Sequence, residues 1–322
     1  MKLLRQERFF WIRGVVVFII TMALMFTLGY WVQSNFGLYG VFYTQLLFIV
    51  ISIAGIFILR LKVKDVLPVK VPRMSQIFGV IIMVISALIP VAALAMINQL
   101  VFPEAIETAD FMGELFRSTP VWIGFLIVSV APAICEEILH RGVIQHTFER
   151  SGFRSKWVTL LSIGLIFGLF HIDYTRYAVT ALLGIVMAYI MIETKNILLP
   201  MLYHFLHNAI SFSAGVVEDA DILGETTPQV MPSNEAMLTG LGFLLILSAG
   251  ALFAIRLGAR LIGARLSDLD EEERQRRMKE RRKMRIITVI ASSVLFVMGV
   301  ILIAVYVGQA EMFQELVQEL MN

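Results

Sequence analysis

Residues 121–142 read VWIGFLIVSVAPAICEEILHRG. Residues 121–139 are an apolar run of the length that a helix needs to cross a bilayer. Two adjacent acids, Glu136 and Glu137, stand near the end of this run, and Arg141 follows them. An ionisable side chain near the bilayer centre costs on the order of 3 kcal/mol, so each of these groups needs a partner or a task. The stretch therefore predicts a membrane helix that carries a specialised polar cluster.

The composition of the whole chain agrees with a lipid environment. Hydrophobic residues make up 58% and charged residues 16% of the 322 positions, which leaves too little polar surface to cover a water-soluble globule. The net charge of +2 is too small to indicate a nucleic-acid partner. The single cysteine, Cys135, excludes an internal disulfide framework, and its apolar neighbours indicate a packed side chain. We expect an all-α, polytopic integral membrane protein.

Apolar runs long enough to span a bilayer recur along the chain. They lie near residues 14–32, 37–59, 77–101, 121–139, 157–172, 177–192, 196–216, 237–255 and 286–308. We therefore expect about nine transmembrane helices. The first run has nearly the length of a full span and no small-residue cleavage site follows it, so we expect it to be retained.

The segments that connect the apolar runs are alternately basic and acidic. The basic segments are the N-terminus, the connection with Arg60, Lys62, Lys64, Lys70 and Arg73, the connection with Arg150, Arg154 and Lys156, and the stretch from Arg256 to Arg285. The acidic ones lie at 104–114, at 218–225 and at 311–319. Because short cytoplasmic loops collect Lys and Arg, this pattern predicts a multi-pass plasma-membrane protein with a cytoplasmic N-terminus and an extracytoplasmic C-terminus. We expect residues 268–285 to form a solvated cytoplasmic helix.

Polar residues within the apolar runs concentrate in the middle of the chain. They are Glu136, Glu137, His140, Arg141, His171, His204, His207 and Asn208. On a helix, Glu137 and Arg141 share a face and can pair, which leaves Glu136 available. A buried carboxylate without a countercharge suits the work of a general base. Each residue taken singly also fits a polar contact between helices, but together they indicate a functional site.

Three short motifs in this region resemble one family. Glu136-Glu137 with Arg141 fits EExxxR, Phe167 with His171 fits FxxxH, and His204 with Asn208 fits HxxxN. In this order on membrane helices, they are similar to the motifs of the CAAX protease and bacteriocin-processing family, also called the abortive-infection family. Many relatives carry an aromatic residue where this chain has His140.

The resemblance implies an intramembrane endopeptidase that acts on membrane-associated peptides or proteins and is related to CAAX prenyl proteases. It implies that Glu136 activates a water with help from His171, and that His204 and Asn208 stabilise the oxyanion. Glu137, Arg141 and His140 would shape the site. The division of the chain would then be N-terminal transmembrane helices at 1–120, a catalytic membrane core at 121–215, and C-terminal transmembrane helices with a charged cytoplasmic segment at 216–322.

These residues fit two catalytic mechanisms of a protease, and they also fit two other classes of membrane protein. We prefer a metal-free glutamate enzyme that needs no cofactor, but Glu136, His171 and His204 also form a credible zinc ligand set. A non-enzymatic bacteriocin-immunity or scaffold protein would use the same residues to hold helices together. A proton-coupled transporter would use them as a relay, although no inverted repeat is visible.

Simple span limits create a mismatch in depth within this site. They place Glu136 nearer the cytoplasmic face and His171 nearer the outer face, and the gap could exceed ~10 Å at ~1.5 Å per residue. We therefore expect the fourth helix to continue past Arg141 towards Phe148, and the fifth to begin later than Trp157. We expect the catalytic cavity to open towards the cytoplasmic side.

Overall fold

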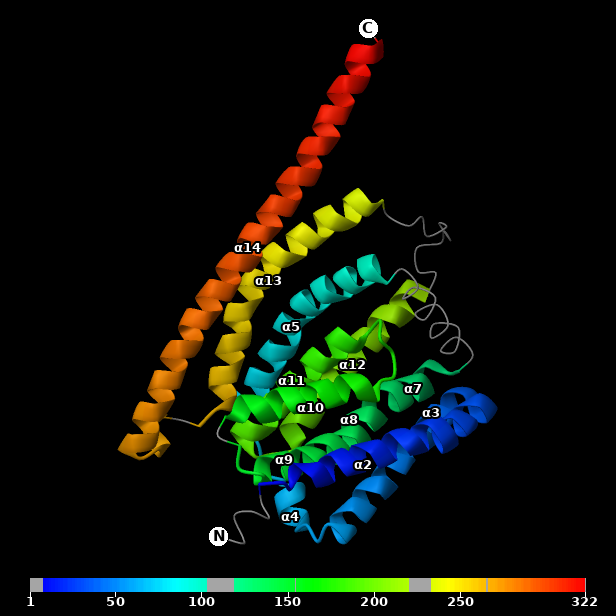
Figure 1. The fold of residues 1–322 in the computed structure, drawn as a ribbon, viewed down its shortest axis with the longest axis vertical. Coiled ribbons are helices and arrows are strands. Elements are labelled where there is room, and N and C mark those ends of the chain that lie inside the picture. The colour runs from blue at the N-terminus through cyan, green and yellow to red at the C-terminus, as the bar shows by residue number, and fades with distance from the viewer. Residues whose placement is uncertain (1–7, 103–118, 154, 220–232, 265, 322) are drawn as a thin grey trace.

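The computed structural model describes residues 8–102, 119–153, 155–219, 233–264 and 266–321. Helices account for nearly all regular structure in this part of the chain, and no strand occurs within it (Figure 1). The chain is thus a polytopic all-α membrane protein, as its composition predicts. The acidic segments predicted at 104–114 and around 221–225 lie outside the described residues.

The N-terminal apolar runs fold into two arms that double back on each other. The first arm contains α2 (Trp11–Leu24) and the π-helical turn η1 (Met25–Gly29), and it continues into α3 (Tyr30–Ile58). Within α3 the backbone reverses at Gly37, whose φ of 52° is open to glycine but unfavourable for other residues. Across the reversal, the Gln33 amide donates to the Thr44 hydroxyl at 3.1 Å. The two predicted spans are therefore one helical hairpin.

Residues 121–150 form one long, mostly buried helix at the centre of the bundle. It consists of α7 (Val121–Phe125), η2 (Leu126–Val130), α8 (Ala131–Glu137), η3 (Ile138–Ile144) and α9 (Gln145–Arg150). The segments η2 and η3 are π-helical and flank the two glutamates of α8. Such turns shift the hydrogen-bond register and recur at functional sites. The helix extends past Arg141 to Arg150, which confirms the predicted extension and puts Glu136 near its midpoint.

The next three helices pack against one side of this central helix (Figure 1). They are α10 (Lys156–Phe170), α11 (Tyr177–Thr194) and α12 (Leu198–Asp219). The prediction that the fifth apolar helix begins after Trp157 is wrong, because Ser155 caps it and α10 begins at Lys156. Its 15 residues span about 22 Å, less than the ~30 Å of a hydrocarbon core. His171 therefore follows a helix too short to reach the far side of the membrane.

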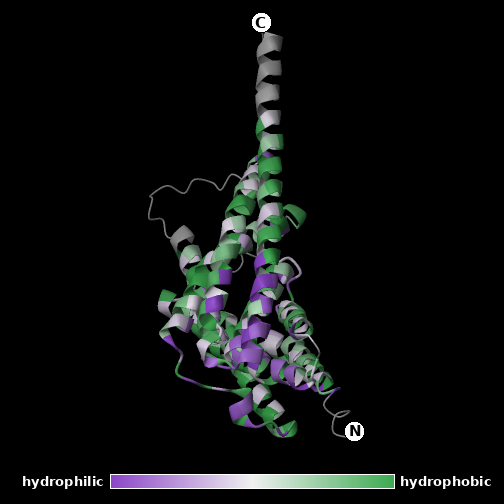
Figure 2. Ribbon diagram, turned by 90° about the vertical axis from the view of Figure 1, so that its left-hand side faces the viewer, coloured by the Kyte–Doolittle hydropathy of each residue, from purple (hydrophilic) through white to green (hydrophobic). Residues whose placement is uncertain are grey.

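Helix α13 (Asn234–Ile262) packs against both α5 (Met74–Val101) and the last helix, α14 (Glu271–Met321). Glycines permit close approach here, because a Cβ at Gly242 would lie 2.9 Å from the carbonyl oxygen of Gly299. Polar residues gather near the start of α14, whereas apolar residues continue along the helices (Figure 2). Ile290 and Ile301 of α14 are exposed, as expected for side chains that face lipid.

The charged segment predicted at 268–285 is not simply solvated. It comprises the short helix η4 (Leu266–Asp268) and the first turns of α14. Arg277 forms an ion pair with Glu193, whose side chain is only 5% exposed, and Lys156 bonds the same carboxylate at 2.9 Å. These ion pairs, in which the carboxylate is buried and both cations are partly exposed, join the start of α14 to the end of α11 and the start of α10.

By length and composition, six helices of the described chain are able to cross a membrane, against the nine runs predicted. The first of the six, Trp11–Ile58, contains two predicted runs joined at Gly37. The fifth run forms α10, which is shorter than a span, and the seventh forms α12, which carries polar residues of the site. Each run forms a helix, and the difference in number comes from how those helices are joined or shortened.

Candidate active site

The second glutamate of the pair is fixed by two partners. Arg141 Nη1 donates to Glu137 Oε1 at 2.8 Å, and both side chains are fully buried. His204 Nδ1 of α12 lies 2.9 Å from the same oxygen. Arg141 Nη2 also donates to the carbonyl oxygen of Gly184 at 3.2 Å, and its guanidinium lies 4.5 Å from the centre of the Phe167 ring. The predicted Glu137–Arg141 pair therefore joins the central helix to α11 and α12.

The first glutamate has a partner that the sequence analysis does not identify. Gln45 Nε2 of α3 donates to Glu136 Oε1 at 2.9 Å, and both residues are buried. Glu136 Oε2 is buried without a hydrogen-bond partner in the described structure. The sequence predicts that Arg141 pairs with Glu137 and not with Glu136. The hydrogen bonds agree, because the Arg141 side chain donates to Glu137 and to the carbonyl oxygen of Gly184.

The two histidines of the predicted site are anchored in the same way. His171 Nδ1 lies 2.8 Å from the carbonyl oxygen of Phe167, and His204 Nδ1 lies 2.9 Å from Glu137 Oε1. In both cases Nδ1 faces an acceptor, so Nδ1 carries the proton. A neutral ring of this form presents an unprotonated Nε2, and only the protonated ring has a second N–H to donate.

The remaining predicted residues contact the backbone. Asn208 Nδ2 donates to the carbonyl oxygen of Val128 at 3.1 Å, within the π-helical turn η2. His140 Nδ1 lies 3.0 Å from the carbonyl oxygen of Glu136, and its ring packs edge-on against Phe167 and Phe170. His140 thus contacts the backbone of Glu136 rather than its carboxylate. This geometry is compatible with the supporting role expected for it.

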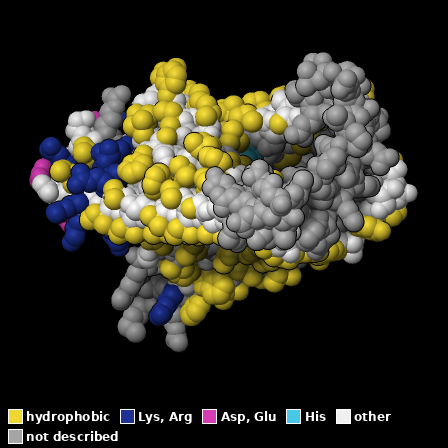
Figure 3. All heavy atoms as spheres, turned by 90° about the horizontal axis from the view of Figure 1, so that it is seen from above, with side chains coloured by type: hydrophobic (Ala, Val, Ile, Leu, Met, Phe, Trp, Pro, Cys, Tyr) yellow, Lys and Arg dark blue, Asp and Glu magenta, His cyan; other side chains and the backbone are white. Residues whose placement is uncertain are grey.

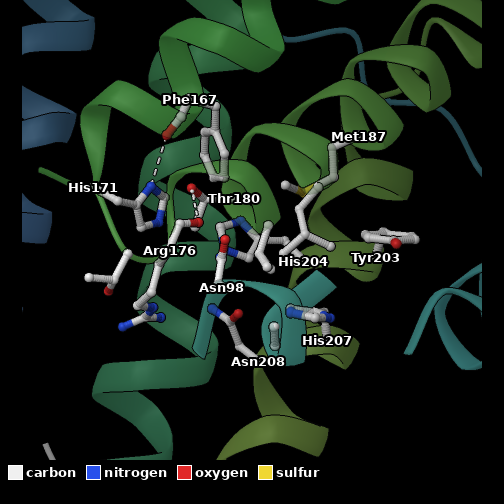
Figure 4. Close-up of a pocket in the computed structure, with 14 residues that line it drawn as sticks. Asn98, Phe167, His171, Arg176, Thr180, Met187, Tyr203, His204, His207 and Asn208 are labelled. Carbon is white, nitrogen blue, oxygen red and sulfur yellow. Dashed lines mark hydrogen bonds between the residues drawn. The ribbon is translucent and has the colours of Figure 1, made fainter. Parts of the chain in front are cut away.

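His171, His204 and Asn208 meet at a cavity of about 230 Å³. Figure 4 shows these side chains around the cavity with His207, Asn98 of α5, and Arg176. Of the described residues, the lining includes neither Glu136 nor Glu137. The structure therefore assembles the histidines and the asparagine at one cavity, and it holds Glu136 nearby in the central helix, within electrostatic range of His171.

The lining of this cavity comes from different depths of the bundle. It includes Asn98 near the end of α5 and Arg176 in the connection after α10, whereas the starts of α5 and α10 lie beside basic connections. It also includes His204 in the second turn of α12, which begins three residues after the basic Lys195. In Figure 3 a histidine is visible in a hollow away from the Lys and Arg cluster. The opening of the cavity towards the cytoplasmic side stays a prediction.

An irregular connection between α10 and α11 contributes to the wall of the cavity. Ile172 has a φ of 57°, an unfavourable value for a β-branched residue. Asp173 Oδ1 accepts bonds from the backbone N–H of Thr175 at 2.9 Å and from its hydroxyl at 2.6 Å. Non-helical backbone at membrane depth is tolerated where it is buried in protein or lines a wet cavity. The short α10 and this connection together place His171 and Arg176 at the site.

No group of three or more His, Cys, Asp or Glu side chains in the described residues is placed to hold a metal ion. The proposed zinc ligands have other contacts in this arrangement, since Glu136 accepts from Gln45 and His204 contacts Glu137. Each histidine nonetheless keeps its Nε2 atom, which is a common metal ligand.

Two residues at the site were missed in the sequence analysis. Gln45 is a polar residue inside an apolar run, which is a recognisable signal in membrane helices. Arg176 lies in a short break between two apolar runs, where a basic residue is unremarkable. Only the folded connection shows that Arg176 borders the same cavity as His171.

Comparison with known proteins supports this location of the site. Residues 118–210 match the family model described as Type II CAAX prenyl endopeptidase Rce1-like. The matched segment contains all seven residues predicted for the site, and Gln45 lies outside it. Searches of curated proteins and of solved structures give no match. Over residues 118–210, the chain is therefore similar to the Rce1-like family of CAAX prenyl endopeptidases.

Proposed function

We propose that this protein hydrolyses peptide bonds of membrane-associated peptides or proteins with a water activated by Glu136. The observation that carries the proposal is the Glu136 carboxylate, buried in the family segment with Oε2 lacking a hydrogen-bond partner among the described residues. A buried polar atom of this kind requires a water or a proton to satisfy it. Glu137 Oε2 also lacks a hydrogen-bond partner among the described residues, but Glu137 forms an ion pair with Arg141 and contacts His204, so its carboxylate suits the role of a base less well.

In the proposed reaction, Glu136 Oε2 takes a proton from a water, and the water oxygen attacks the peptide carbonyl carbon. The carbonyl oxygen becomes an oxyanion while the C–N bond is still intact. The carboxyl then returns the proton to the leaving amine as the C–N bond breaks. Because its Nδ1 faces a backbone carbonyl, a neutral His171 offers an acceptor at Nε2 that suits orientation of the water.

Stabilisation of the oxyanion by His204 has a defined requirement. Since Nδ1 of His204 faces Glu137, a donor at Nε2 exists only when the ring is protonated. Asn208 can donate its second amide hydrogen, because the bond to Val128 uses only one.

Arg176 suits recognition of a negatively charged part of the substrate. Its side chain is exposed, it borders the cavity, and its guanidinium has no ion pair or hydrogen bond with any described residue. The described lining contains three histidines and no Asp or Glu. We therefore propose that Arg176 binds a carboxylate of the substrate peptide, either at its C-terminus or on an acidic side chain.

The Glu136→Gln variant tests the proposed function. The amide keeps the size of the side chain but cannot take a proton from water, so cleavage should fall by at least about a hundredfold. A suitable probe is an internally quenched peptide with a farnesylated cysteine three residues before a free C-terminus, supplied in liposomes. Glu235→Gln, at an exposed site on α13, is the matched control and should retain full activity.

A purified wild-type protein that cleaves neither this probe nor a broad library of membrane peptides would contradict the proposal. So would equal cleavage by the wild type and Glu136→Gln. A strong chelator separates the two catalytic versions, because it should leave a glutamate enzyme active and abolish a zinc enzyme.

A further inference from the structure

Gln45 is the one described side chain that hydrogen-bonds the Glu136 carboxylate. It lies in the second arm of the N-terminal hairpin, 91 positions before Glu136 and outside the matched family segment. Gln45 is 5% exposed and Glu136 is 6% exposed, so bulk water does not compete for the bond. A hydrogen bond between two buried groups in a low dielectric is stronger than one in water.

The orientation of this bond follows from the chemistry of the two groups. An amide presents both a donor nitrogen and an acceptor oxygen, whereas an ionised carboxylate accepts only. With Nε2 towards Glu136, the pair forms a bond of 2.9 Å, and a flipped amide would place two oxygens against each other. The remaining oxygen of each group, Gln45 Oε1 and Glu136 Oε2, is buried with no partner among the described residues.

The bond restrains the orientation of the carboxylate, because it ties one of its two oxygens to α3. The other polar side chains around Glu136 have different partners in the described structure. Arg141 donates to Glu137 and to the carbonyl oxygen of Gly184, and His140 and His171 contact backbone carbonyl oxygens. Gln45 is therefore the side chain that sets which oxygen of Glu136 stays free.

We infer that Gln45 is a positioning residue for the general base: it holds Glu136 Oε1 and leaves Oε2 as the atom that accepts the proton. The inference rests on the proposed function for the identity of the base. It assigns to the N-terminal hairpin a part in catalysis that the family segment does not contain. A purely structural role, in which Gln45 only joins α3 to α8, predicts a loss of stability with an unchanged kcat in the folded protein.

Steady-state kinetics on the peptide probe, combined with thermal unfolding of the whole protein in detergent, separate these two roles. In Gln45→Met, which keeps a similar shape and removes the donor, kcat should fall about tenfold to a hundredfold with little change in KM, at a temperature where the variant is folded. Ser52→Ala is the matched control on α3, because this buried hydroxyl donates to the carbonyl oxygen of Phe48 within its own helix.

Two results would overturn the inference: a wild-type kcat in folded Gln45→Met, or an equal loss of kcat in Ser52→Ala. If Gln45→Met does not fold, Gln45→Asn serves instead, since the shorter side chain keeps the amide and withdraws its donor from Glu136 Oε1. A wild-type kcat in that variant would then contradict the inference.

The two proposals fail in distinguishable ways. If Glu136→Gln retains cleavage, the proposed function is wrong whatever the kinetics of Gln45→Met show. If Glu136→Gln is inactive while Gln45→Met keeps the wild-type kcat, the function stands and the role of Gln45 is wrong.

Discussion

At the scale of single residues, the neighbouring glutamates differ because they point to different helices. Glu137 meets Arg141 and His204, and Glu136 meets Gln45. A fully buried ion pair such as Glu137–Arg141 loses hydration on burial, and its additional bonds offset that loss. Glu136 has a single neutral donor and keeps one oxygen available. The proposed division of labour, in which Glu137 organises the site and Glu136 reacts, follows from these contacts.

The proposed role of Arg176 gives a prediction at the same scale. In Arg176→Gln, kcat/KM for a peptide with a free C-terminal carboxylate should fall about fivefold to tenfold, because an opposite charge at the cavity is lost. The same peptide with a C-terminal amide should be cleaved equally by both proteins. A third peptide, with an amidated C-terminus and an internal Glu, shows whether an acidic side chain is bound instead. Arg260→Gln, at an exposed site on α13, is the control.

Equal losses on the amidated and the free peptides would contradict a role of Arg176 in binding a carboxylate. The comparison among peptides matters more than the absolute rate, because each protein serves as its own reference.

At the scale of elements, the site depends on helices that approach closely or end early. A Cβ at Gly164 of α10 would lie 2.3 Å from Ile185 Cγ1 and 2.8 Å from the carbonyl oxygen of Ala181, so α10 and α11 are in close contact. Small residues permit such contact between membrane helices. The short α10 then ends at Phe170, and His171 faces the cavity instead of the membrane surface.

The Gly164→Ala variant tests this packing. The added methyl group meets a backbone oxygen of α11 that cannot move away alone, so the free energy of unfolding should fall by about 1–3 kcal/mol. Gly250→Ala is the matched control, because nothing lies within 4 Å of its added Cβ. Thermal or denaturant-induced unfolding in detergent measures both. Equal stability of the two variants would show that the contact between α10 and α11 is looser than the structure indicates.

At the scale of the whole molecule, the basic connections lie beside one another. The side chain of Arg73 donates to the carbonyl oxygen of Gly263, and the backbone N–H of Lys70 donates to Asn196. The rule for Lys and Arg predicts that this end of the bundle faces the cytoplasm. Lys64 belongs to these connections, and Thr119 lies two residues before α7, at the other end of the central helix.

Single-cysteine labelling in intact cells tests this orientation. A membrane-impermeant maleimide should label Thr119→Cys directly, and it should label Lys64→Cys only after the membrane is permeabilised. The parent protein is a suitable background, because its sole cysteine, Cys135, is 7% exposed and should not react. The reverse pattern would contradict the predicted orientation.

The fold class was predictable because hydropathy acts along the chain. A run of about 20 apolar residues must satisfy its backbone as a helix in lipid, whatever its neighbours are. The pairing of Glu137 with Arg141 was predictable for a similar reason, because two residues four positions apart on one helix lie on the same face. The start of α10 and the contacts of the charged segment at the start of α14 were harder to predict, because a side-chain cap and ion pairs with distant residues determine them.

The sequence by itself determined an all-helical membrane protein with a polar cluster on three of its apolar runs. Only the tertiary structure decided that Gln45 bonds Glu136, that His204 contacts Glu137, and that Arg176 borders the cavity. The physical reason is that helical periodicity specifies a face within one helix. Which faces of separate helices meet depends on packing between residues far apart in the chain.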